Sequence, residues 1–141
     1  MRPSAAGLGL AAALLALPSL AIACTCAQPP TPQAGLESAE RVFLGVVERF
    51  EVEGARRVAT FRVGTVWKGP RQARITVTTG GGDGDCGVHF VAGREYLVYA
   101  GQGRQARLET SICTRTAWIK DARDDMRSLG PGSGVPGPGS R

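Results

Sequence analysis

Four cysteines constrain this chain more than any other feature of its sequence. Cys24 and Cys26 are one residue apart at the start of CTCAQPPTPQ, whereas Cys86 and Cys113 are far from them and from each other. A bond between Cys24 and Cys26 would close a very small, strained ring. In an extended segment, residues i and i+2 point to the same face, so each can reach a separate partner. We therefore expect both to bond to Cys86 and Cys113, in either pairing, and each bond to stabilise the fold by about 3–5 kcal/mol.

The residues before Cys24 have the pattern of an export signal. Arg2 supplies a positive charge, Leu8–Leu17 is apolar, and Ala21-Ile22-Ala23 is an A-x-A cleavage site. The apolar stretch is shorter than the roughly 20 residues that a transmembrane helix needs. We predict a signal peptide over residues 1–23, no transmembrane segment, and a secreted protein, extracellular or periplasmic, whose mature chain begins at Cys24. Export to an oxidising compartment agrees with an even number of cysteines.

Two other uses of the cysteines remain open. Ala21–Cys24 also resembles a bacterial lipobox, in which Cys24 would be acylated and the protein anchored to a membrane by lipid. Acylation would leave three cysteines, one of them unpaired, so the even count favours simple cleavage. A zinc site of four cysteines is disfavoured, because one C-x-C pair and two single cysteines do not match the paired C-x2-C spacing.

Composition points away from an enzyme and from a nucleic-acid-binding protein. The chain has 141 residues, which predicts one domain, and its net charge of +5 comes from scattered arginines with only 6% aromatic residues. His89 is the single histidine, and no hydrolase motif is present. Asp83 and Asp85 lack the rest of a calcium-binding loop, so we expect a flexible, turn-forming loop over Gly80–Gly87. We predict a monomer without enzymatic activity, cofactor or nucleic-acid partner.

Hydrophobic periodicity predicts a mainly β domain over residues 24–129. Slips in the alternation near Val58–Phe61 and Val66–Trp67 predict β-bulges. Ile75 and Val77 are expected to face inward, and Thr76 and Thr78 outward. Five strands are expected over residues 41–53, 56–68, 73–79, 94–101 and 106–113.

Two short helices are expected to flank the strands. Thr31 as N-cap and Pro32 at the first position predict a helix to about Glu40. Trp118, Ala122, Met126 and Leu129 share one helical stripe, with Gly130 as the stop. The Gly/Pro-rich residues 130–141 are predicted to be a disordered tail. Because strands do not alternate with helices, we predict a five-stranded barrel of the OB-fold type rather than a parallel α/β sheet.

Four motifs, in order, resemble the N-terminal netrin-like domain of the tissue inhibitors of metalloproteinases. They are the mature start CTCAQPPTPQ, VGTVWKGP, DCGVHFVAGREYLVYAG and RLETSICTRTAWI. The matched order covers nearly all of residues 24–129. Animal members have more cysteines and a second domain, so the resemblance is to a bacterial-type, single-domain member. Netrin-like domains also occur as protein-binding modules that inhibit nothing, which is the alternative function.

The resemblance implies disulfides Cys24–Cys86 and Cys26–Cys113 and an OB-fold barrel. It also implies inhibition of zinc metalloendopeptidases: the free α-amine and the carbonyl oxygen of Cys24 would chelate the catalytic zinc of the protease partner. Such a zinc keeps one position open for water, which the chelating terminus would displace. The resemblance further implies that the protease contacts are Cys24, Thr25, Cys26, Ala27 and Gln28, together with Asp83, Gly84, Asp85 and Cys86.

Overall fold

Two long strands form the central hairpin of the structure. The computed structural model describes residues 24–27, 30–82 and 84–137. Within them, β1 (Arg41–Glu53) pairs antiparallel with β2 (Arg56–Lys68) along its length. The predicted turn lies between them at Gly54, whose φ of 62° is a conformation that glycine adopts without steric cost. Both strands therefore begin and end as predicted.

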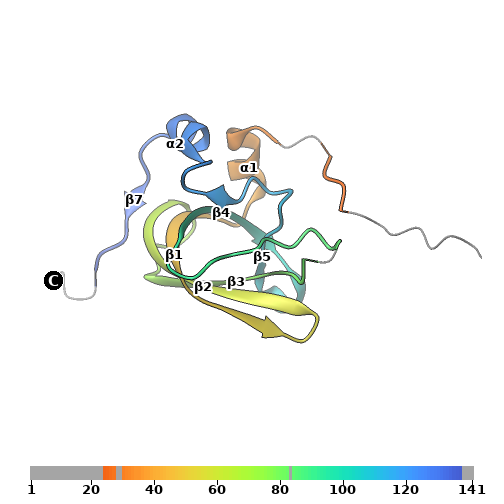
Figure 1. The fold of residues 1–141 in the computed structure, drawn as a ribbon. Coiled ribbons are helices and arrows are strands. Elements are labelled where there is room, and N and C mark those ends of the chain that lie inside the picture. Colours follow the sequence, from red (N-terminus) through yellow and green to blue (C-terminus); the bar gives the residue numbers. More distant parts are fainter. Residues whose placement is uncertain (1–23, 28–29, 83, 138–141) are drawn as a thin grey trace, which may run out of the picture.

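The rest of the sheet closes on this hairpin in a ring of five strands (Figure 1). β3 (Arg74–Gly80) pairs with β2, and β4 (Glu95–Gln102) pairs with β1. β5 (Leu108–Glu109) joins β3 in parallel and β4 antiparallel, so the order is β1-β2-β3-β5-β4 and back to β1. The described residues also contain a 3-10 turn, η1 (Arg104–Ala106), and two more short strands, β6 (Ala117–Trp118) on β4 and β7 (Ser133–Gly134) on β2.

Irregular register bends the hairpin at three points. Val42 pairs with Lys68 but Phe43 with Val66, so Trp67 is an extra residue in β2, as predicted. The other predicted bulge, near residues 58–61, lies instead on the facing strand, where Glu48 is the extra residue of β1. Such bulges increase the twist and bend that a sheet needs to close on itself.

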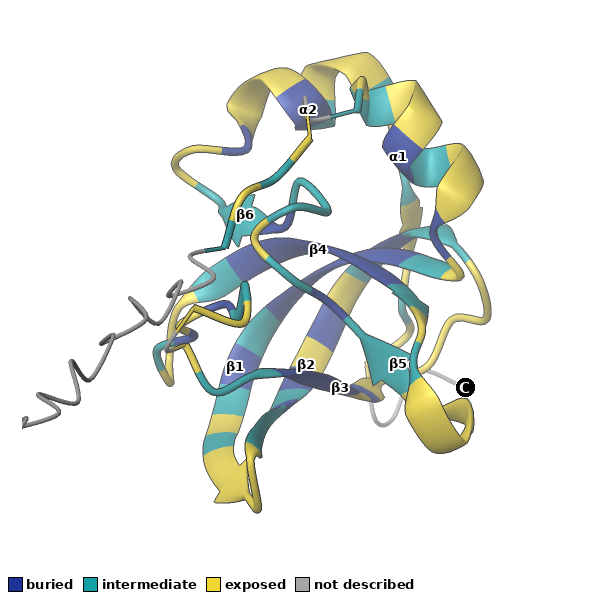
Figure 2. Ribbon diagram, turned by 90° about the vertical axis from the view of Figure 1, so that its right-hand side faces the viewer, coloured by how far each residue is buried: buried dark blue, intermediate teal, exposed yellow. Residues whose placement is uncertain are grey.

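The ring separates two hydrophobic clusters, and Figure 2 shows the buried residues running along the middle of β1 and β4. The cluster inside the ring contains four aromatic rings in edge-to-face contact, with Phe61 and Phe90 centroids 5.1 Å apart. The second cluster lies between the sheet and the helices. Its fully buried members, which share positions on β1, β4 and the start of α2, are Val42, Leu97, Tyr99 and Ala122.

Two helices lie beside each other over this second cluster (Figure 2). α1 (Pro32–Ser38) begins as predicted, with Thr31 Oγ1 accepting a hydrogen bond from Ala34 N at 3.2 Å. α2 (Arg123–Leu129) ends at Gly130 as predicted but begins later than its helical stripe implied. Trp118 was wrongly placed in this helix. Its backbone pairs with Tyr96 of β4 instead. Neither helix is long and apolar enough to cross a membrane, nor is any other in the described part of the chain.

Two strand predictions are corrected by β5. The strand expected over residues 106–113 contains only Leu108 and Glu109, because the chain then turns toward Cys113. Thr78, which was expected to face outward, is 6% exposed. Its hydroxyl donates to the Leu108 carbonyl at 2.9 Å, since β5 lies directly against β3 at this point.

The start of the predicted disordered tail is ordered against the sheet. Ser133 and Gly134 pair with β2, and Trp67 Nε1 donates to the Gly130 carbonyl at 2.8 Å. A side chain at Gly132 would collide with Thr65, so glycine lets the backbone approach the strand closely. The prediction of disorder is therefore wrong for residues 130–135, while residues 138–141 lie outside the described residues.

Replacing Trp67 with Phe should loosen this ordered segment. The variant keeps an aromatic ring but loses the hydrogen bond to Gly130, which costs about 1 kcal/mol of unfolding free energy. The amide of Val135, which donates to Gly64 at 2.9 Å, should exchange with deuterium faster. Trp118→Phe is the matched control. Equal exchange of the Val135 amide in both variants would show that the indole N–H does not hold the tail.

Candidate functional site

Two disulfides fasten the segment Cys24–Ala27 to two loops that are distant in sequence. Cys24 is bonded to Cys86 and Cys26 to Cys113, with Cα separations of 5.1 and 5.3 Å. The predicted cross-link of the N-terminal cysteines to the two later ones is confirmed. Sulfur atoms of Cys24, Cys26 and Cys113 lie within 4.8 Å of one another. All of them belong to disulfides, which leaves no thiolate for the alternative zinc site.

Side chains of this segment alternate between the protein and the solvent. Cys24 and Cys26 are half-buried, whereas Thr25 and Ala27 are exposed. This is the alternation of an extended segment, in which neighbouring side chains face opposite directions. The segment therefore presents Thr25 and Ala27 outward while its sulfur atoms hold it to the body of the protein. Gln28, the next predicted contact, lies outside the described residues.

The glycine-rich loop that carries Cys86 is closed by one carboxylate. Asp85 accepts hydrogen bonds from the backbone N–H groups of Gly81 at 2.6 Å, Gly82 at 2.9 Å and Gly87 at 3.3 Å. A side chain at Gly87 would collide with the backbone of Gly80. The loop expected to be flexible is thus tied together by the carboxylate of Asp85, which is itself an exposed residue. Gly84 is exposed, and Asp83 lies outside the described residues.

The two loops that receive the disulfides are also bonded to each other. Ile112 N donates to the Cys86 carbonyl at 3.0 Å, and within its own loop Cys113 N donates to Ser111 Oγ at 3.2 Å. Cys86 has a φ of 61°, a conformation that non-glycine residues rarely adopt and that surrounding contacts must hold. Both anchor points therefore belong to one connected surface at the same side of the molecule as the N-terminal segment (Figure 1).

A buried hydroxyl cluster supports the turn that carries Cys113. Thr110 Oγ1 lies 2.9 Å from the Tyr99 carbonyl, 2.9 Å from Thr114 Oγ1 and 2.7 Å from Thr116 Oγ1. Thr110 is 1% exposed. Buried polar groups are stabilising when they are mutually satisfied, as these are. These hydrogen bonds consequently fix the turn to Tyr99 of β4.

The arginine of a part-buried ion pair also holds the chain at Pro30, shortly after the N-terminal segment. Arg115 Nε donates to Asp125 Oδ2 at 2.7 Å, Nη2 pairs with Oδ1, and Nη1 donates to the Pro30 carbonyl at 2.7 Å. Tyr99 Oη donates to the same carboxylate at 2.9 Å. Burial, followed by this hydrogen bond, raises the pKa of Tyr99 well above its usual range. The hydrogen bond that Arg115 donates to the Asp125 carboxylate raises the pKa of the guanidinium.

Sequence reasoning missed Arg115, Asp125 and the role of Asp85. Asp125 is 6% exposed on a helix whose first turn is acidic, a pattern that normally indicates a solvated helix start. No spacing rule pairs it with Arg115. For Asp85, the neighbouring glycines were the available signal, because a carboxylate among glycines can accept several backbone N–H groups.

Protonation of Asp85 should open the loop. The N–H groups of Gly82, Gly81 and Gly87 hold the pKa of this carboxyl below its ordinary value, which is about 3.9. A depressed pKa means that the stabilisation is complete above about pH 4 and is lost as pH falls through the folded-state pKa. The amide proton shifts of Gly81 and Gly82 should therefore titrate with a midpoint below 3.9 in an NMR series. Asp85→Asn is the control, and a midpoint above 4 would contradict the arrangement.

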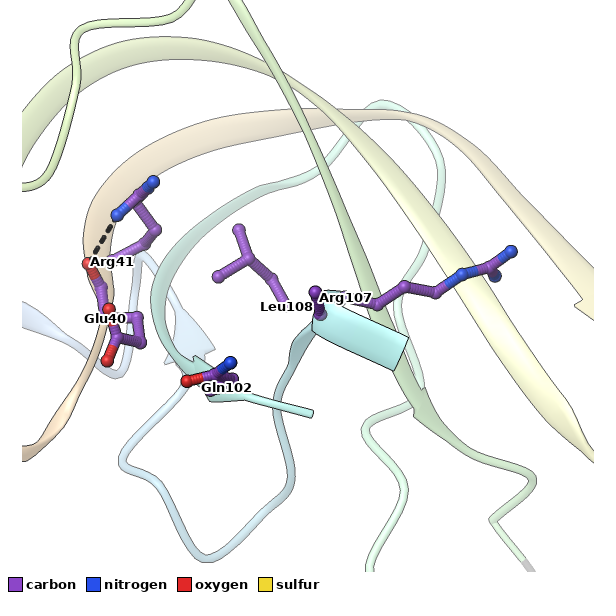
Figure 3. A pocket seen from close by; sticks show the side chains of 6 residues that line it. Glu40, Arg41, Gln102, Arg107 and Leu108 are labelled. Carbon is purple, nitrogen blue, oxygen red and sulfur yellow. Dashed lines mark hydrogen bonds between the residues drawn. The ribbon is translucent and has the colours of Figure 1, made fainter. Parts of the chain in front are cut away.

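One pocket lies away from the N-terminal segment. A pocket of about 220 Å³ opens between the start of β1, the end of β4 and η1. In Figure 3 the Arg107 side chain points away from Leu108, and Arg41 Nη1 donates to the Glu40 carbonyl at 3.0 Å. Arg107 is ion-paired with Glu53.

The single histidine lies apart from that pocket's lining residues. His89 is exposed and packs edge-to-face on Phe50, with centroids 5.9 Å apart.

Comparison with family models and with curated proteins finds no match to this chain.

Proposed function

We propose that this protein is an exported inhibitor of zinc metalloendopeptidases and that Cys24, as the mature N-terminus, is its inhibitory group. The observation that carries the proposal is the double anchoring of Cys24–Ala27 by Cys86 and Cys113. Once a signal peptide over residues 1–23 is removed, the α-amine and carbonyl oxygen of Cys24 lie at a half-buried, cross-linked position. A terminus held in this way keeps both atoms in a fixed mutual orientation.

The mechanism needs only the backbone of the first residue. In the complex, the amine nitrogen and carbonyl oxygen of Cys24 would both bind the protease's zinc and displace the water from its open position. Without that water the enzyme has no nucleophile. An α-amine has an unperturbed pKa of roughly 7.7–8.0, so a useful fraction is neutral near pH 7. This protein itself holds no cofactor in the mechanism.

Exposed side chains beside Cys24 would provide the protein–protein contacts. Thr25 is proposed to enter the specificity pocket next to the zinc, and Ala27 and Gln28 to follow along the cleft. Gly84, with Asp83, would form a second edge of the contact surface. Asp85 would hold that edge in shape, because its carboxylate accepts hydrogen bonds from backbone N–H groups of the loop. The two disulfides anchor the segment in advance, which reduces the entropy lost on binding.

The fold supports the resemblance behind this proposal. We assign the ring β1-β2-β3-β5-β4 to the OB type, in the netrin-like form. Three of the four family-like motifs meet at the N-terminal segment: one contains Cys24 and Cys26, one Cys86 and one Cys113. Fold alone does not determine function, so the proposal depends on this convergence rather than on the ring.

The first test is an inhibition assay with the natural mature protein. Intact-mass analysis of exported protein should show a chain starting at Cys24 with two disulfides. This form should inhibit a zinc metalloendopeptidase stoichiometrically but leave a serine protease unaffected. A diacylglyceryl adduct on Cys24, or no inhibition of any zinc endopeptidase tested, would instead favour a lipid-anchored or non-inhibitory binding module.

A further inference from the structure

Beyond the disulfides, the N-terminal segment is held at a third point by a side chain. Arg115 Nη1 donates to the carbonyl oxygen of Pro30 at 2.7 Å, only four residues after Cys26. The same guanidinium donates hydrogen bonds to both carboxylate oxygens of Asp125 on α2. One planar group therefore connects the exit of the N-terminal segment to the helix layer.

The position of this arginine makes the connection stiff. Arg115 comes two residues after Cys113 and has a φ of 71°, so its backbone is in the left-handed region. Its side chain is 24% exposed, and that of Asp125 is 8% exposed. Non-glycine residues persist in this conformation only where the surroundings enforce it. Three contacts hold Arg115 in this conformation: the ion pair with Asp125, the hydrogen bond to Pro30 and the adjacent disulfide Cys26–Cys113.

We propose that Arg115 is a positioning residue for inhibition, which anchors the chain at Pro30 close to the cross-linked Cys26 and so helps to aim the Cys24 terminus. The inference rests on the proposed function. A disulfide fixes the distance between two Cα atoms but permits rotation about it. Anchoring the carbonyl of Pro30 adds a third point to the two disulfides, and three separated points define an orientation.

Only arginine has the geometry for this role. Its guanidinium has five N–H donors in a rigid plane, enough for a bidentate carboxylate and a carbonyl together. Lysine keeps the charge but is a single flexible donor group. Arg115→Lys should therefore preserve the neutralisation of Asp125 while losing the simultaneous hold on Pro30.

Tyr99→Phe is the matched control for stability. It removes a hydrogen bond to the same carboxylate, at 2.9 Å, without touching Pro30. We expect Arg115→Lys to weaken inhibition of a zinc metalloendopeptidase at least about 10-fold more than Tyr99→Phe does. We also expect lower ¹⁵N order parameters at the Cys26 and Ala27 amides in Arg115→Lys alone.

A double variant keeps the test informative if Arg115→Lys folds poorly. Arg115→Gly with Asp125→Asn leaves no unpaired buried charge, and glycine accepts the positive φ without strain. It should fold yet show the same loss of order and inhibition. Unchanged order at Cys26 and Ala27 in either folded variant would overturn the inference. If the wild-type protein inhibits nothing, the proposed function fails, while the order parameters still decide whether Arg115 positions the segment.

Discussion

Adding one alanine before Cys24 is expected to abolish inhibition. An extra residue converts the α-amine into an amide nitrogen, which does not bind zinc. It also moves the new amine about 3.8 Å from the anchored position. The loss should be at least about 100-fold in the inhibition constant, equivalent to about 2.7 kcal/mol. The measurement is a titration of a zinc metalloendopeptidase with the mature and the extended protein side by side.

The matched control adds the same alanine after Arg141, far in sequence from the terminus. That variant should inhibit like the mature protein, and acetylation of the Cys24 amine should reproduce the loss. Mass spectrometry of the extended sample after the assay must show that the protease did not trim it back to Cys24. An intact extended protein that inhibits as strongly as the mature one contradicts chelation by the amine.

Removing the disulfide Cys26–Cys113 should cause the largest loss of stability of any change considered. The bond joins residues separated by 87 positions. In the chain-entropy model, closing a loop of this size stabilises the folded state by about 4–5 kcal/mol. The double variant Cys26→Ser with Cys113→Ser should lose this amount in urea unfolding, with a fall in inhibition because Thr25 and Ala27 lose their anchor.

The second disulfide provides the comparison. Cys24–Cys86 has a sequence separation of 62, so the model predicts a slightly smaller loss for the corresponding double serine variant. Tyr99→Phe, which leaves both bonds intact, sets the scale of an ordinary substitution. A loss below about 1 kcal/mol for either disulfide variant would show that other contacts already hold the segment, and the entropic account would then be wrong.

The elements that local sequence predicted correctly are those governed by local rules. Thr31 and Pro32 begin α1 because a capping hydroxyl and a fixed proline φ act within one turn. The alternation in β1 and β2, and the turn at Gly54, depend only on neighbouring residues. That Cys24 and Cys26 bond to Cys86 and Cys113 was predictable from four cysteines, whereas which cysteine pairs with which was implied only by the family resemblance.

The errors occur where distant segments decide the structure. Thr78 is buried because β5 pairs alongside β3 at this point. Trp118 is extended because its backbone pairs with β4. Gly132 lies on β2 because Trp67 donates to Gly130. In each case a contact across the fold outweighed the local pattern.

The candidate site shows the same division. The exposure of Thr25 and Ala27 followed from alternation with the cysteines, whereas the hydrogen bond from Arg115 to Pro30 joins residues 85 positions apart. Asp85 was predicted as a protease contact; it is exposed, and local sequence did not predict that its carboxylate accepts backbone N–H groups of its own loop. The sequence therefore predicted the cross-links but not the hydrogen bonds of Arg115 and Asp85 beside them.

Zinc ligation by Cys24 can be observed directly in a cobalt-substituted metalloendopeptidase. Co²⁺ in the catalytic site absorbs visible light with a spectrum that depends on its ligands. One equivalent of the mature protein should change this spectrum, since the amine and carbonyl of Cys24 replace the bound water, and the alanine-extended protein should not. Inhibition by the mature protein with an unchanged cobalt spectrum would contradict the account, because the enzyme would then be blocked without contact between Cys24 and the metal.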